Sequence, residues 1–223
     1  MSALPIKLPT RRTEDWRWAD LSGLEALAAA GPANDAHPDV SPLWLDVPGP
    51  RLLFIDGRLV AGSSRLDEVE IAVFDGEMPV HPLAVKAVAQ AGAGLRLRLG
   101  VDSPEIGTVQ IVNFGTRGAA HVVHRIILDE DAHASVIETY AGQGWSNGFV
   151  DIVLARGARL MRTVRVLKGG GAHTELAQVS VAGAASYTGS VLVTGCDSAR
   201  IETHALLAGP GAYAQSDGVL LGR

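Results

Sequence analysis

The chain has 223 residues, of which 47% are hydrophobic and 19% charged, and its formal net charge is −5. This acidic balance argues against a nucleic-acid-binding protein, because phosphate-backbone binding needs clustered Lys and Arg. The single cysteine, Cys196, excludes an internal disulfide and a cysteine-only metal site. No apolar run reaches membrane-spanning length, and residues 1–20 lack the apolar region of a signal peptide. We therefore expect a soluble, cytoplasmic protein without nucleic-acid or membrane partners.

The opening stretch RRTEDWRWADLSGL, residues 11–24, contains two of the four tryptophans, Trp16 and Trp18. Its interleaved acids argue against a nucleic-acid arm and against an anchor on anionic lipid. Thr13 is placed to cap a short helical turn, and Ser22 starts a capping box for the next helix. We expect a folded element in which both tryptophans are packing anchors.

The rest of the first 104 residues mixes helix and strand signals. The helix after the capping box is expected to stop at Gly31. Asp56-Gly57 lies between two apolar runs and predicts a β-hairpin. The segment HPLAVKAVAQAG predicts a second helix, with Pro82 in its first turn. Residues 1–104 are therefore expected to form a small mixed α/β region.

From about residue 109 the sequence becomes repetitive. Small-residue turns precede each apolar run, with anchoring alanines at Ala119, Ala132, Ala158, Ala172, Ala184, Ala199 and Ala212. Their spacings are 13, 26, 14, 12, 15 and 13, and the segment GQGWSNG at 142–148 fills the long interval. One strand and one turn thus recur about every 13 residues, and two units give a period of about 26. Fixed-period strand repeats of this size are typical of a solenoid.

Alternation within the strands supports that interpretation. In FVDIVLA one face carries Val150, Ile152 and Leu154, and the same alternation recurs in ELAQVSV and TVRVL. Stacked inward faces build one core that no single repeat could bury alone. The predicted fold is mainly β: residues 105–223 form a β-helix of flattened coils, preceded by the N-terminal α/β region.

The predicted β-helix determines which histidines can meet. Odd and even repeats lie on opposite walls, which separates His133 from His173. His124 and His204 are expected in the same register on one wall, but about three rungs or roughly 14 Å apart. His121 and His124 face opposite ways because they are three apart on a strand. We therefore predict no metal site, and each histidine is expected at the surface or in a local hydrogen bond.

Other candidate motifs favour turns over chemistry. The segment at 168–174, KGGGAHT, lacks the order of a phosphate loop, and GTRG at 115–118 lacks the helices of a KH domain. Cys196 is expected to be a passive corner thiol, and the acids at 129–131 a charged turn. No Ser/His/Asp set emerges, so no catalytic residue is assigned. Without a convergent polar cluster, the β-helix is interpreted as a scaffold or interaction platform.

The opening stretch and the repeats together resemble the SufB/SufD family of iron–sulfur cluster assembly proteins, and its SufD branch more closely. At the N-terminus the resemblance rests on Pro9, Arg11 or Arg12, Glu14, Trp16, Arg17, Trp18, Asp20 and Leu21. RLLFIDGRLV is similar to the Asp-Gly strand of the family. In the repeats the resemblance rests on Glu138, Tyr140, Asn147, Gly157, Ala158 and, in GAYAQSDG, Asp217.

The resemblance implies a non-catalytic component of the SUF scaffold. It implies pairing with a SufB-like subunit and a SufC-like ATPase, with a homodimer as a further possibility. An iron–sulfur cluster would form transiently on the assembled complex, and this chain would hold no stable cofactor. Family members continue well past the Asp217 region, so either this chain is shortened or the role of the remaining part is performed differently. The cluster-assembly residues of the family are therefore not transferred to any position here.

Two other functions stay open. A β-helix enzyme acting on carbohydrate or acyl substrates would need a polar groove on adjacent rungs. The nearest candidate is the wall carrying His133, Arg159, Ala185 and Tyr213, which Ala185 interrupts. A self-assembling structural β-helix would instead use an uncapped end as its contact surface.

Overall fold

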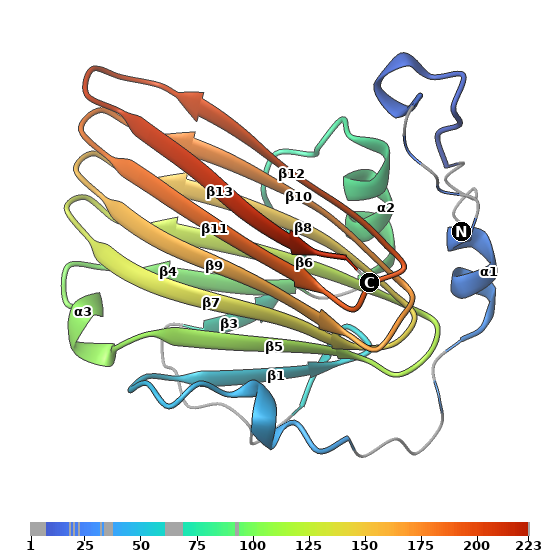
Figure 1. Ribbon diagram of the computed structural model, residues 1–223. Helices are drawn as coiled ribbons and strands as arrows, with labels where there is room; N and C mark the ends of the chain where they lie inside the picture. Colours follow the sequence, from blue (N-terminus) through green and yellow to red (C-terminus); the bar gives the residue numbers. More distant parts are fainter. Residues whose placement is uncertain are drawn as a thin grey trace.

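Two β-sheets, built mainly of parallel strands, face each other and form a flattened solenoid (Figure 1). The computed structural model describes residues 8–17, 19, 21, 23–31, 33, 38–60, 69–91 and 94–222. Sheet A has the strand order β13-β11-β9-β7-β5-β1-β2, and sheet B has the order β12-β10-β8-β6-β4-β3. From β4 onward successive strands alternate between the sheets, so that the chain adds one strand to each sheet per turn. The predicted mainly β, solenoidal fold is confirmed.

Strands β6 to β13 have nine or ten residues each, and the strands of the first rungs are shorter. In sheet A they are β1 (Arg51–Ile55), β2 (Arg58–Leu59), β5 (Val109–Gly115), β7 (His133–Gly142), β9 (Arg159–Lys168), β11 (Ser186–Thr194) and β13 (Tyr213–Leu221). In sheet B they are β3 (Val69–Ala72), β4 (Gly94–Leu99), β6 (Ala119–Leu128), β8 (Trp145–Leu154), β10 (Ala172–Val181) and β12 (Ser198–Leu207). The remaining elements are η1 (Glu14–Trp16), α1 (Leu24–Ala29), η2 (Ser41–Leu43), α2 (Pro82–Gln90) and α3 (Ser103–Ile106).

The strand register confirms the predicted period. His133 pairs with Arg159, 26 residues later, and Arg159 pairs with Ser186, 27 residues later. The long interval between Ala132 and Ala158 contains β8, as expected. Two anchoring alanines were assigned one residue out of register: Ala184 one residue too early, and Ala199 one residue too late, because Ala172 pairs with Ser198. The residue equivalent to Ala158 is the buried Ala185, because Ser186 follows it in register with Arg159.

One residue of each repeat adopts left-handed backbone at the corner beside that alanine. The successive residues are Asp131, Gly157, Ala184 and Gly211, with φ of 56°, 72°, 57° and 72°. Only glycine adopts this conformation without a steric cost. Ala184 therefore marks the bend itself, while the alanine after the bend fills the core.

The interior divides into an aliphatic half and a polar half. In sheet B one inward row runs Leu99, Leu128, Leu154 and Val181 along four stacked strands. These side chains are at most 1% exposed and belong to the main apolar core. Towards the opposite corners, the inward positions of β7, β9 and β10 carry charged and aromatic side chains instead. The side chains that face the interior are therefore not all apolar.

Helices α1 and α2 pack on the outside of sheet B, where α2 contacts β6, β8 and β10 (Figure 1). Helix α2 confirms the second predicted helix, with Pro82 in its first turn and the His81 side chain accepting a hydrogen bond from the Ala84 amide at 3.4 Å. The hairpin at Asp56-Gly57 is confirmed by the antiparallel pairing of β1 and β2. Trp16 is 3% exposed, so it is the packing anchor that the sequence predicts.

Two predicted caps are not formed as expected. Thr13 occupies the N-cap position of η1, but its side chain makes no capping hydrogen bond. Helix α1 begins at Leu24 with Gly23 at its N-cap position, so the capping box predicted from Ser22 does not start this helix. Ser22 and Trp18 themselves lie outside the described residues.

The two sheets cross the predicted boundary at residue 105 without a break. Strand β1 pairs in parallel with β5, and β4 pairs in parallel with β6. The first rungs of the solenoid are therefore built from residues before 105, and the division into two domains stays a prediction. Within the described part of the chain, no helix is long and apolar enough to cross a membrane.

Candidate functional site in the polar interior

An arginine and two glutamates meet between the two sheets. Glu138 on β7 and Arg162 on β9 come from sheet A, and Glu175 on β10 comes from sheet B. All three point inward because they continue the inward alternation of their strands, in which Val164, for example, follows Arg162 by two residues. Glu138 is 0% exposed, Arg162 2% and Glu175 3%. The strand alternation thus places three ionisable side chains in the interior of the solenoid, from which the stacked repeats exclude water.

Arg162 bridges the two carboxylates. Its Nε donates to Glu138 Oε1 at 2.7 Å, and its Nη2 donates to Glu175 Oε1 at 2.9 Å. The Tyr140 hydroxyl donates to Glu138 Oε2 at 3.1 Å. Both sheets are thereby joined across the interior by charge-assisted hydrogen bonds, which are stronger than neutral ones.

The two glutamates differ in their proton affinity. Burial raises the pKa of both carboxyls. At Glu138 the charge of Arg162 and its hydrogen bond outweigh burial, so the pKa is lowered. At Glu175 burial outweighs the attraction of Arg162, and the charge of Glu138 adds to it, so the pKa is raised. Glu138 is therefore the stable anionic partner of Arg162, and Glu175 is the group that takes a proton more easily.

Two buried histidines flank this cluster. The His173 ring lies 4.4 Å from the Tyr140 ring, and the His124 ring lies 5.3 Å from the Phe54 ring, both measured between centroids. Burial, together with the charges of Lys168 and Arg162, lowers the pKa of His173 to about 3. Burial likewise lowers the pKa of His124. Among the described residues neither ring finds a hydrogen-bond partner, so both imidazoles are neutral at pH 7.

A buried lysine extends the polar half to the solenoid corner. Lys168, the last residue of β9, donates from Nζ to Ser146 Oγ at 3.0 Å and to the Gln143 carbonyl at 3.2 Å. Burial lowers its pKa to about 8, although the nearby Cys196 acts in the opposite direction. Cys196 is half-buried at the neighbouring corner, as its sequence position predicts. Lys168 is thus a second buried cation on β9, separated from Arg162 by the buried side chains of Val164 and Val166.

A glycine leaves the space that the cluster occupies. Gly148 on β8 faces inward, and a Cβ added there would lie 3.1 Å from the Tyr140 hydroxyl and 3.3 Å from Glu175 Cγ. These contacts are tighter than ordinary van der Waals packing. The absence of a side chain at Gly148 therefore leaves room for the bulky side chains of Tyr140 and Glu175.

The cluster is enclosed by both sheets, so its chemistry is to hold charge and hydrogen bonds inside the solenoid. Of the two carboxylates, Glu175 is the less paired, because its Oε2 has no hydrogen-bond partner among the described residues. In the same described ranges, no three His, Cys, Asp or Glu side chains are arranged to hold a metal ion. The arrangement fits a charged structural core whose protonation can change, and it provides no open substrate pocket.

The residues of the family resemblance are dispersed. Glu138 lies in the interior cluster, while Asn147 lies under α2, donating from Nδ2 to the Leu83 carbonyl at 2.9 Å. Gly157 forms a corner with φ of 72°, and Asp217 on exposed β13 accepts a hydrogen bond from Gln215 at 2.5 Å. In η1, Glu14 and Arg17 form an exposed ion pair of 3.5 Å beside the buried Trp16. Trp18 is not described.

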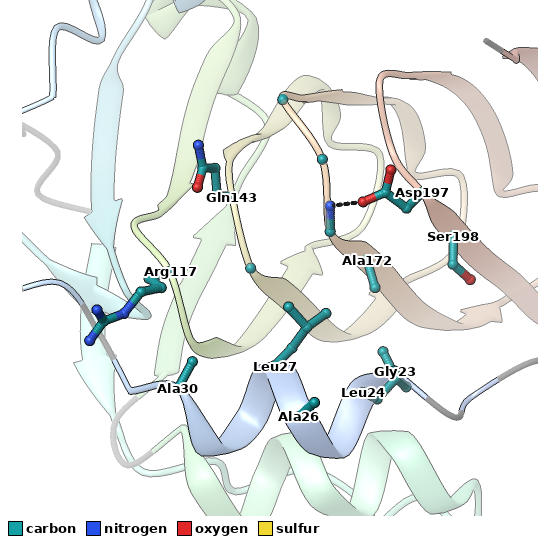
Figure 2. Close-up of a pocket in the computed structure, with 14 residues that line it drawn as sticks. Gly23, Leu24, Ala26, Leu27, Ala30, Arg117, Gln143, Ala172, Asp197 and Ser198 are labelled. Carbon is teal, nitrogen blue, oxygen red and sulfur yellow. Dashed lines mark hydrogen bonds between the residues drawn. The ribbon is translucent and has the colours of Figure 1, made fainter.

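An apolar groove of about 610 Å³ lies between α1 and the glycine corners (Figure 2). Leu24 and Leu27 form one wall, and residues 169–171 form part of the other. Asp197 Oδ2 accepts a hydrogen bond from the Gly171 amide at 2.6 Å. This carboxylate is thereby engaged in shaping the corner, and the groove has few polar groups that converge on one point.

The interior cluster corrects the expectation that the β-helix lacks a convergent polar site. The alternation of inward and outward positions along the strands could have located the residues that were missed. Counting back by two from Val164 reaches Arg162, and counting back from Ala177 reaches Glu175 and His173. The expectation for the histidines is wrong for His124 and His173, which are buried and lack hydrogen bonds among the described residues.

Two register predictions are also wrong by one residue. His124 is in register with Val150, Ala177 and Thr203, so His204 is not its equivalent and points outward. On sheet A the row containing His133 and Arg159 continues through Ser186 to Tyr213, and not through Ala185. His133 and His173 do lie on opposite walls, as predicted.

Fold and interior together define a two-sheet β-solenoid of mainly parallel strands with a charged core. A family model described as "SUF system FeS cluster assembly, SufBD core domain" matches residues 112–223, which is half of the chain. The chain therefore belongs to the SufBD core family. It is similar to the iron–sulfur cluster assembly protein SufD of Escherichia coli (strain K12), with 29% identity over 152 residues. That match covers 60% of this chain and 35% of the relative, so the chain spans about a third of the relative's length.

Proposed function

We propose that the chain is a non-catalytic component of the SUF iron–sulfur cluster assembly scaffold in the cytoplasm. The observation that carries the proposal is that the SufBD core match coincides with the regular solenoid, from within β5 to residue 223. The similarity to SufD supports the same role. The iron–sulfur cluster is cargo in this proposal. It forms transiently on the assembled complex, and this chain holds no stable cofactor.

We propose a SufB-like subunit and a SufC-like ATPase as partners. The last strands support a contact at the end of the solenoid, because β12 and β13 each have only one strand partner among the described residues. Unpaired strand edges are templates for a partner strand. Apolar side chains accompany these edges: Leu206 is 66% exposed and Leu220 is 69% exposed. A second copy of the chain could use the same surface, which is the homodimer alternative.

Co-purification tests the partner assignment. The chain is mixed at micromolar concentration with SufB-like and SufC-like subunits, and the complex is followed by size-exclusion chromatography with light scattering. We expect a discrete complex that Leu220→Glu weakens, because a charge would enter the apolar end surface. Met161→Glu is the matched control, since Met161 is 63% exposed on an outer face of the solenoid. Absence of any complex would contradict the partner assignment, and a dimer or polymer of the chain alone would favour self-assembly.

A further inference from the structure

A hollow of about 480 Å³ lies on the outer face of sheet A beside α3. Its floor consists of two register rows that cross β7, β9 and β11. One row contains His133, Arg159 and Ser186, and the other contains Ser135, Met161 and Thr188. Neighbouring strands are about 4.8 Å apart, so the polar groups of one row are within reach of one small ligand.

The position of the hollow is fixed by a hydrogen bond from its wall. The Ser103 hydroxyl, at the start of α3, lies 2.9 Å from the His133 carbonyl oxygen and 2.5 Å from the Gly100 carbonyl oxygen, and its one proton is shared between these two acceptors. This bond holds α3 beside the beginning of β7 (Figure 1). The hollow is therefore a feature of packed elements, with strands as its floor and a helix as its rim.

The charge of the hollow runs against that of the chain. The chain has a net charge of −5, yet the residues that line this hollow include Arg159 and His133 and no carboxylate. Among the described residues Arg159 has no ion-pair partner, whereas Arg156, three residues earlier, binds Glu130 at 2.9 Å. An unneutralised guanidinium beside an imidazole forms a local positive field.

Three other hollows include both an arginine and a carboxylate among the residues that line them. The groove beside α1 contains Asp197 with Arg117, and the hollow at the end of the solenoid contains Glu202 and Asp217 with Arg200. The hollow on the outer face of sheet B contains Asp151 and Glu77 with Arg125. The hollow of His133 and Arg159 therefore differs from these three, because its lining includes an arginine and no carboxylate.

The hydroxyl groups complete an anion site. Ser135, Ser186 and Thr188 line the hollow, and their hydroxyls have no partner among the described side chains. A guanidinium with several hydroxyl donors matches the oxygen-rich geometry of phosphate. We propose that this hollow binds a phosphate dianion, either free or as the phosphomonoester of a small molecule. This site is independent of the proposed scaffold function.

Titration with inorganic phosphate and with glycerol phosphate tests the proposal. Binding is measured by calorimetry on the full chain at low ionic strength, with sodium chloride at equal ionic strength as the blank. We expect Arg159→Gln to weaken binding about tenfold, because it removes a charged hydrogen-bond donor. Arg156→Gln removes the same charge three residues away and is expected to change the affinity less than about twofold.

The outcomes separate clearly. Tighter binding of glycerol phosphate identifies a phosphomonoester site, and equal affinities identify a site for free phosphate. Amide resonances of Ser135 and Ser186 should shift on titration in either case. No binding at about 10 mM of either probe, or equal weakening by Arg156→Gln and Arg159→Gln, would overturn the proposal. The thermal unfolding midpoint of each variant shows that the fold is retained.

Discussion

Arg162 is the residue on which the polar interior depends. It is 2% exposed and binds Glu138 and Glu175 on opposite sheets. Removing one partner from a buried ion cluster leaves an uncompensated charge, which costs far more than removing the whole cluster. The three charged residues are therefore needed together, although the net stability that the cluster adds over an apolar core is small.

Arg162→Met tests this dependence. We expect the free energy of unfolding in urea to fall by about 3–5 kcal/mol, because Glu138 is left buried and charged without its partner. The triple variant Arg162→Met, Glu138→Gln, Glu175→Gln carries no charge at these sites and should recover part of the loss. A single variant as stable as the wild-type chain would show that the bridge is dispensable.

At the scale of elements, the corners of the solenoid set how closely the coils stack. A Cβ on Gly144 would lie 2.2 Å from the Gly118 carbonyl oxygen, and one on Gly171 would lie 2.2 Å from the Gly144 carbonyl oxygen. Both residues also have positive φ, of 71° and 77°. Each coil thus rests directly on the backbone of the coil before it.

Gly171→Ala is expected to destabilise the chain strongly, by roughly 2–4 kcal/mol, because the methyl group meets backbone and the left-handed conformation adds a steric cost. Urea denaturation followed by circular dichroism measures the change. Gly100→Ala is the matched control, since a Cβ there meets no atom within 4 Å, and it should alter stability by less than about 0.5 kcal/mol. Equal effects of the two substitutions would contradict the stacking argument.

At the scale of the whole molecule, the buried neutral histidines couple stability to pH. The pKa of His173 is lowered to about 3 and that of His121 to about 4, chiefly by burial. Between pH 6.5 and these values the unfolded chain binds more protons than the folded one, so stability falls as pH falls. Glu175 acts in the opposite sense, because its raised pKa makes the folded state bind a proton above the unfolded pKa.

We expect His173→Gln to reduce the stability lost between pH 7 and pH 5. Linkage assigns roughly 2 kcal/mol of that loss to His173, because its unfolded form protonates in this interval and its folded form does not. Free energies of unfolding in urea at both pH values measure the effect. An unchanged pH dependence in His173→Gln would contradict the assignment.

Much of the architecture is predictable from local pattern. The period of about 26 residues, the alternation of apolar side chains, the Asp56-Gly57 hairpin and helix α2 are properties of short segments. Each depends on backbone geometry and on the spacing of apolar groups, which are visible in sequence. The errors of one residue arose at two corners, at Ala184 and Ala185 in sheet A and at Ser198 and Ala199 in sheet B. At each corner two small residues are adjacent, and only the strand pairing distinguishes them.

The sequence by itself determined a solenoid of paired strands, because stacking faces repeat at a constant interval. Only the tertiary structure decided which charged side chains meet in the interior and which polar side chains share one outer surface. Glu138 and Glu175 come from opposite sheets and meet at Arg162 only when two coils close on each other. His133, Arg159 and Ser186 share a surface only through register between strands far apart in sequence. Such contacts depend on register and winding, since a shift of one residue turns every side chain to the other face.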